Sequence, residues 1–77
     1  MQDETKHDIE EKKRQLLEKL SLIRKREKLQ QAELAELTGY KQQTISRLES
    51  QENDPRLTSI INVANAFGYE LKLVRKQ

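Results

Sequence analysis

Four polar side chains near the middle of the chain have a spacing that would place them together on one side of a helix. Counted from the first, they stand at i, i+1, i+4 and i+5, opposite the apolar residues Ile45 and Leu48. A glutamine can bond N6 and N7 of one adenine, and an arginine can bond O6 and N7 of one guanine, so such a face is suited to reading base edges in double-stranded DNA. The alternative interpretation is that they are ordinary polar residues of a solvated surface. The four are Gln42, Gln43, Ser46 and Arg47.

The residues around this face have the spacing of a helix-turn-helix, over QAELAELTGYKQQTISRLES (31–50). Two helices cross closely only where a side chain is small, which Ala35 provides. A turn of three or four residues needs a residue that accepts a positive φ, which Gly39 provides. The alternative is an αα-hairpin in an ordinary helical bundle. The apolar positions expected to lock the second helix against the first are Leu34, Tyr40, Ile45 and Leu48.

A long helix is predicted ahead of this motif, over residues 9–27, where good helix formers dominate. Leu17 and Leu22 fall off its apolar stripe and are expected to be more exposed. The stripe, which is expected to face the core, consists of Ile9, Leu16, Leu20 and Ile23.

Three further helices complete the expected helical set. The helix-turn-helix supplies one from residue 30 or 31 up to Gly39 and another over about 41–50. A polar loop over 51–55 closes with a proline, and a last helix runs over about 58–67. Its expected buried side chains are Ile60, Ile61, Ala64 and Phe67.

The C-terminal end alternates apolar and polar residues with a period of two, which predicts one β-strand over 69–73. Because the chain offers no second strand to pair with its backbone N–H and C=O groups, a copy of itself in a homodimer is the most economical partner. The side chains expected to line this dimer strand are Tyr69, Leu71 and Leu73.

These elements predict an all-α fold: a compact four-helix domain with a central helix-turn-helix, a long N-terminal helix, and one short C-terminal β-strand paired across a dimer. Residues 1–8 are expected to form a disordered polar leader, 9–68 the helix-turn-helix DNA-binding domain, and 69–77 the C-terminal strand with a basic tail. A chain of 77 residues leaves no room for a second domain.

The composition argues against an enzyme and against a metal site. No residue is cysteine, and the single histidine, His7, stands in a charged leader, so neither a Ser-His or Cys-His pair nor a zinc site with histidine partners can be built. We therefore expect no catalysis, no cofactor and no metal. No apolar run approaches the ~20 residues of a membrane span, and the lack of cysteine fits a reducing cytoplasm.

The formal net charge of +2 is unevenly distributed along the chain. Residues 1–11 carry five acidic side chains and one basic, whereas residues 12–77 carry 14 basic and 8 acidic. The folded part is therefore basic, with clusters at 24–26 and 75–76. Such clusters fit binding to nucleic acid, although charge runs are also common on solvated helix faces.

Residues 16–71 resemble the Xre/Cro helix-turn-helix family, the group of the lambdoid phage repressors. The resemblance lies in LSLIRKREKLQQAELAELTGYKQQTISRLE and DPRLTSIINVANAFG. It implies that Gln31 holds a phosphate at the start of the second helix and braces Gln42. It also implies a structural pair of Arg24 and Glu49 that ties the first helix to the third. Further phosphate contacts are implied for Lys41, Thr44 and Arg56.

Three features depart from the pattern of that family. Gln30 stands where Ser or Thr usually caps the second helix, and it is expected to cap less well. Leu37 is apolar at a usually polar position. The loop after the third helix lacks the usual Gly and Lys, and its acidic groups repel phosphate. The loop residues concerned are Ser50, Gln51, Glu52 and Asp54.

Two functional hypotheses follow. The first is a sequence-specific DNA-binding transcriptional regulator that binds a palindromic operator as a homodimer. The alternative, implied by small relatives with a similar C-terminal ending, is a type II antitoxin of the HigA or HipB type, which would neutralise a protein toxin and repress its own operon. Either would act in the cytoplasm of a bacterium or of a phage-infected cell. A purely structural module would leave Gln42, Gln43 and Arg47 unexplained.

Overall fold

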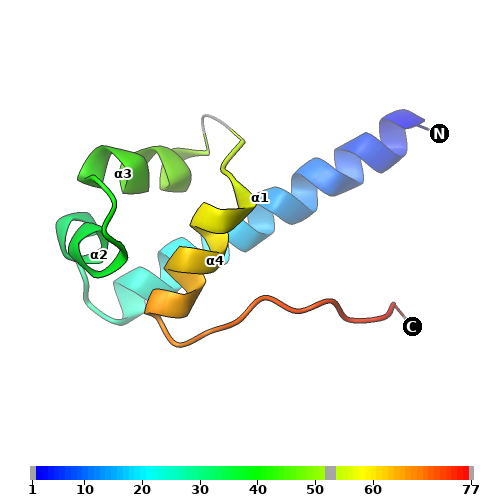
Figure 1. Ribbon diagram of the computed structural model, residues 1–77. Coiled ribbons are helices and arrows are strands. Elements are labelled where there is room, and N and C mark those ends of the chain that lie inside the picture. The colour runs from blue at the N-terminus through cyan, green and yellow to red at the C-terminus, as the bar shows by residue number, and fades with distance from the viewer. Residues whose placement is uncertain (1, 52–53, 77) are drawn as a thin grey trace.

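The computed structural model describes residues 2–51 and 54–76, with side chains from Lys6 onward. Within these residues the chain forms four α-helices. They are α1 (Gln2–Arg26), α2 (Gln31–Thr38), α3 (Gln42–Ser50) and α4 (Leu57–Ala66). The three shorter helices gather around the C-terminal half of α1, while its N-terminal half projects beyond them (Figure 1). None of the helices in the described part of the chain is long and apolar enough to cross a membrane.

The helix predicted over residues 9–27 begins earlier, at Gln2. Its projecting half is covered by no other helix (Figure 1) and carries ion pairs between side chains one turn apart. Lys12 Nζ lies 3.3 Å from Asp8 Oδ2, and Lys13 Nζ lies 2.9 Å from Glu10 Oε1. Exposed pairs of this spacing contribute little to the stability of a helix.

Two expectations for the apolar face of α1 are wrong. Leu17, expected off the stripe, is fully buried, with 0% of its surface exposed. Ile9 belongs to the stripe but is 59% exposed. The reason is tertiary: the C-terminal half of α1 packs on both α3 and α4, so its buried face is wide, whereas Ile9 lies in the projecting half.

The first turn of α2 is held by a residue inside the helix. The Glu33 carboxylate accepts the backbone N–H of Gln30 at 2.8 Å, which is half of a capping box. The helix ends where the sequence places its glycine: Gly39 has φ +80° and donates its N–H to the Ala35 carbonyl at 2.9 Å.

The core lies where α2, α3 and α4 meet the C-terminal half of α1. Ala35 is buried, as expected for a small residue between packed helices. On α4 the prediction of a buried Ile61 is wrong: Ile61 is 46% exposed, and Val63 is buried instead. The buried cluster consists of Leu17, Leu20, Leu34, Ala35, Ile45, Leu48, Ile60, Val63 and Ala64.

The predicted C-terminal β-strand is wrong, since no strand occurs among residues 2–51 and 54–76. Residues 69–76 run as an irregular segment from the end of α4 (Figure 1). Tyr69 donates its N–H to the Ala64 carbonyl at 2.9 Å and Leu71 packs on the core, but Leu73 is fully exposed. A period-two pattern specifies alternation but supplies no neighbour, and a strand forms only by hydrogen bonding to one.

Candidate nucleic-acid interface

The packing of α3 determines which of its side chains reach solvent. Ile45 and Leu48 are buried in the core one turn apart, so the opposite face of the helix points outward. The four side chains predicted to read bases all lie on that outward face and all are exposed: Gln42, Gln43, Ser46 and Arg47.

The turn that carries α3 is fixed to its neighbours by side-chain hydrogen bonds. Thr38 donates its hydroxyl to the Leu34 carbonyl at 2.9 Å and accepts the N–H of Tyr40 at 3.3 Å. Asn62 of α4 donates its amide to the Thr38 carbonyl at 3.1 Å. Tyr40 packs against the core, and the polar side chains of Asn62 and Ser59 on α4 hold its pKa below the ordinary value. The orientation of α3 is therefore set by α2, by the turn itself and by α4.

A partly buried ionic network ties α1 to the end of α3. Arg24 donates from Nε and Nη2 to the two carboxylate oxygens of Glu49, at 2.6 and 2.9 Å, and from Nη1 to the Leu29 carbonyl at 2.6 Å. Burial alone would raise the pKa of Glu49, but the hydrogen bonds from Arg24 and Gln31 and the charge of Arg24 hold it below its usual value. The carboxylate thus stays ionised inside the fold.

Gln31 takes part in the same network. Its side-chain amide donates to Glu49 Oε1 at 3.0 Å, at the start of α2. The structure therefore gives Gln31 a partner on α3, but that partner is Glu49. The brace on Gln42 and the phosphate contact that the resemblance implies for Gln31 remain predictions.

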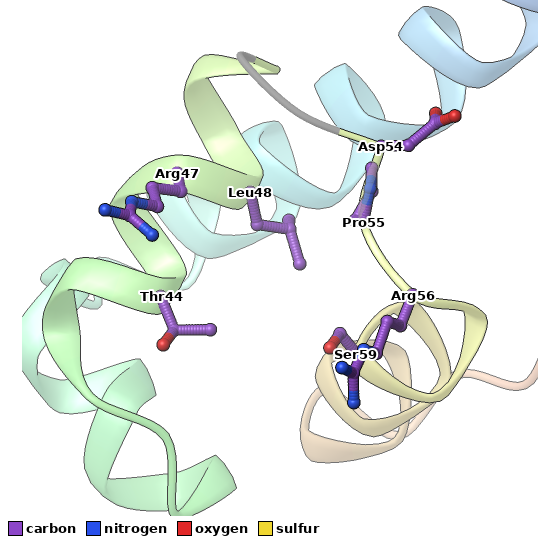
Figure 2. Close-up of a pocket in the computed structure, with 7 residues that line it drawn as sticks. All are labelled: Thr44, Arg47, Leu48, Asp54, Pro55, Arg56 and Ser59. Atoms are coloured by element: carbon purple, nitrogen blue, oxygen red, sulfur yellow. The ribbon is translucent and has the colours of Figure 1, made fainter.

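A hollow of about 280 Å³ lies beside the outward face of α3, between that helix and the start of α4 (Figure 2). Figure 2 shows the guanidinium groups of Arg47 and Arg56 on its two sides, while the Asp54 carboxylate is directed away from both. Guanidinium and hydroxyl groups around an open hollow are chemically suited to a phosphate group. The lining residues are Thr44, Arg47, Leu48, Asp54, Pro55, Arg56 and Ser59.

The other predicted phosphate ligands flank this hollow and the outward face. Lys41 and Arg56 are the exposed N-cap residues of α3 and α4, and Thr44 is half-buried in the first turn of α3. The three residues therefore lie at the starts of α3 and α4, beside the outward face of α3. Their contacts with DNA phosphates remain predictions.

Three residues near the site escaped the sequence analysis. Ser59 lines the hollow, Asn62 fixes the turn before α3, and Lys13 pairs with Asp54. Ser59 and Asn62 are polar residues at i and i+3 of α4, a spacing that places them on one face of the helix and could have indicated a shared contact. No signal in the sequence links Lys13 to a residue 41 positions away. Glu52, one of the acidic loop residues, lies outside the described residues.

Comparison with known proteins identifies related sequences. The family described as helix-turn-helix matches residues 20–74, which include α2, α3 and α4. The chain is also 37% identical over 70 residues to the protein named Antitoxin HigA1 in Mycobacterium tuberculosis, in the CDC 1551 / Oshkosh strain and in H37Rv. That alignment covers 91% of this chain but 46% of each relative, so the chain spans about half the length of the curated relatives it matches. No solved structure matches the chain significantly.

Proposed function

Because the chain belongs to the Xre/Cro-type helix-turn-helix family, we propose that it is a sequence-specific transcriptional regulator, with the action of a repressor, that inserts α3 into the major groove of its operator. The observation that carries this proposal is the exposed face of α3, where Gln42, Gln43 and Arg47 stand together on a helix anchored from behind by buried residues. These side chains have the hydrogen-bonding groups that distinguish adenine and guanine in the major groove.

We further propose that two copies bind a palindromic operator as a homodimer. One helix of the length of α3 covers one half-site, and two must lie about 34 Å apart to enter successive major grooves on one side of the duplex. Several apolar side chains outside the core are available for contact with a second copy. Those with half or more of their surface exposed include Leu22, Tyr69, Leu73 and Val74.

Selection of binding sites from a pool of random duplexes tests this function. We expect enrichment of a symmetric motif whose half-sites are about 10 base pairs apart. The matched control is Lys19→Ala, which removes one exposed cation from α1 as Arg47→Ala removes one from α3. The control should return the wild-type motif, whereas Arg47→Ala should change it. Failure to enrich any motif with the wild-type protein would contradict the proposal.

A second candidate function is neutralisation of a protein toxin. It is supported by the 37% identity with proteins named Antitoxin HigA1. Co-expression with the product of the neighbouring reading frame tests it: we expect a complex that survives purification and restores growth of the host. A chain with Gln43 and Arg47 both replaced by alanine should still form that complex, because those side chains are assigned to DNA. A neighbouring product that is neither harmful nor bound would exclude this function for that pair.

A further inference from the structure

An ion pair joins the projecting half of α1 to the segment that leads into α4. Lys13 Nζ lies 2.7 Å from Asp54 Oδ1, across 41 positions of sequence. The same ammonium lies 2.9 Å from Glu10 on its own helix. The hydrogen bond to Asp54, and to a smaller extent the one to Glu10, raises the pKa of Lys13, so this side chain stays positively charged. Lys13 is the less exposed partner, since 28% of its side chain is exposed against 80% for Asp54.

Asp54 supplies the negative charge among the residues that line the hollow between α3 and α4. It stands two positions before Arg56, and its carboxylate points toward α1 and away from the two guanidinium groups (Figure 2). A carboxylate that turned the other way would compete with a phosphate for Arg56 and would repel it. The sequence alone suggested such repulsion, because acidic residues replace the usual loop cation.

We propose that Lys13 is a positioning residue for duplex DNA: it holds the Asp54 carboxylate away from the hollow, so that a DNA phosphate can reach Arg56. The proposal rests on the DNA-binding function above and adds a residue of α1 that lies outside the helix-turn-helix. Lys13 acts here through Asp54, without touching the phosphate itself.

The expected size of the effect follows from the exposure of the pair. Charges near the protein surface interact through a medium closer to water than to a dry interior, and salt screens them within about 10 Å at 0.1 M ionic strength. Release of the carboxylate should therefore weaken DNA binding by a small factor. The contact is to the backbone of DNA, so a duplex of any sequence reports it.

A double-mutant cycle tests the proposal with the full chain and a fluorescein-labelled duplex of mixed sequence, by fluorescence anisotropy at about 50 mM salt. Lys13→Ala should weaken binding about two- to fivefold, and Lys13→Arg should not. Asp54→Asn alone should change the affinity by less than about 1.5-fold, and Lys13→Ala should have no further effect in that background. Circular dichroism of each variant checks that the helices are retained.

Lys12→Ala is the matched control, because it removes the same charge one position earlier from a lysine paired with Asp8. It should change the affinity by less than about 1.5-fold. An equal loss from Lys13→Ala in both backgrounds, or the same loss from Lys12→Ala, would show a general charge effect and overturn the role of Lys13. Wild-type affinity for Lys13→Ala would overturn it too. A wild-type chain that binds no duplex DNA would overturn the proposed function as well.

Discussion

The outward residues of α3 differ from other exposed polar residues because of what holds the helix behind them. Ile45 and Leu48 fix the rotation of α3 about its own axis, and the Arg24–Glu49 pair fixes its far end. Side chains on such a rigid support lose little freedom when they meet a base. The proposed base reading therefore depends on the anchored helix as well as on the glutamines and the arginine.

Arg47→Ala should remove one base contact and leave the rest of the interface intact. We expect a loss of about 1–3 kcal/mol on the selected operator and a relaxed preference at one base pair, and Gln43→Ala should do the same at another. Arg56→Ala and Gln31→Ala should instead weaken all sequences about evenly, because phosphate contacts carry no base information. A motif unchanged by Arg47→Ala would remove Arg47 from the reading face.

Glu49 should make the stability of the fold sensitive to acid. The pKa of Glu49 in the folded chain lies below its ordinary value of 4.5, so its contribution is fully present above that pH and is lost as the pH falls through the lowered pKa. Glu49→Gln should lower the free energy of unfolding by about 1–3 kcal/mol at pH 7, because the Arg24 guanidinium loses its charged partner. Urea unfolding of the wild-type chain and of Glu49→Gln, at pH 7 and in the acid range, measures the two free energies of unfolding.

The two chains should converge in stability as the pH falls below 4.5. The amide that replaces the Glu49 carboxylate does not take up a proton in that range, so the variant lacks this source of acid sensitivity. A constant difference between wild type and Glu49→Gln down to the lowest pH would contradict the assignment of a lowered pKa to Glu49.

At the scale of the elements, local signals predicted the helix-turn-helix well. Gly39 marks the end of α2 because a positive φ is required there, and Ile45 with Leu48 sets the inward face of α3. Both signals act within one turn of helix. The roles of Leu17 and Ile61 could not be predicted in this way, because they depend on which neighbours cover each helix.

The C-terminal segment shows even more clearly that local sequence signals do not predict contacts with distant neighbours. The alternation places Tyr69, Leu71 and Leu73 on one side of a strand, but of these three Leu71 packs against the core, whereas Tyr69 is half exposed and Leu73 is fully exposed. It cannot indicate a hydrogen-bonded neighbour, and the chain supplies none among its described residues. Likewise, the face of Gln42 and Arg47 was predictable from spacing, whereas the Lys13–Asp54 pair, 41 positions apart, required the tertiary fold.

Two positions of α1 test how the core is assigned. Leu17→Ala should lower the free energy of unfolding by about 2–4 kcal/mol, because its side chain is wholly buried in the core cluster. Leu22→Ala should cost less than about 0.5 kcal/mol, since that side chain is 58% exposed. Denaturant unfolding of the two variants measures the difference, and equal costs would contradict the observed packing of α1.

At the scale of the whole molecule, the acidic segment and the proposed DNA-binding helix lie at opposite ends of an elongated shape. The molecule measures 42 × 26 × 21 Å, and the acidic N-terminal half of α1 projects at the end far from α2 and α3 (Figure 1). In the proposed binding mode the basic and hydroxyl side chains around α3 face the DNA, and the acidic segment lies at a distance from it. This arrangement reduces repulsion from a polyanion.

Affinity for DNA should accordingly depend on salt. Log affinity should fall linearly with log salt concentration, with a slope of about −0.9 for each phosphate neutralised. Arg56→Ala should reduce the magnitude of that slope by about 1, whereas Lys19→Ala on α1 should leave it unchanged. Titrations between about 50 and 200 mM salt measure the slope. Affinity that does not vary over this range would argue against phosphate contacts.

The most direct test of the central claim is titration of the ¹⁵N-labelled chain with the selected duplex, with every backbone amide followed by NMR. Binding through α3 predicts that the largest shifts fall on residues 41–47 and 56–59, which carry the outward face and the hollow beside it. Amides of residues 6–12 in the projecting half of α1 should stay nearly unchanged. Shifts confined to α1 or to residues 69–76, or no shifts at all, would contradict the account.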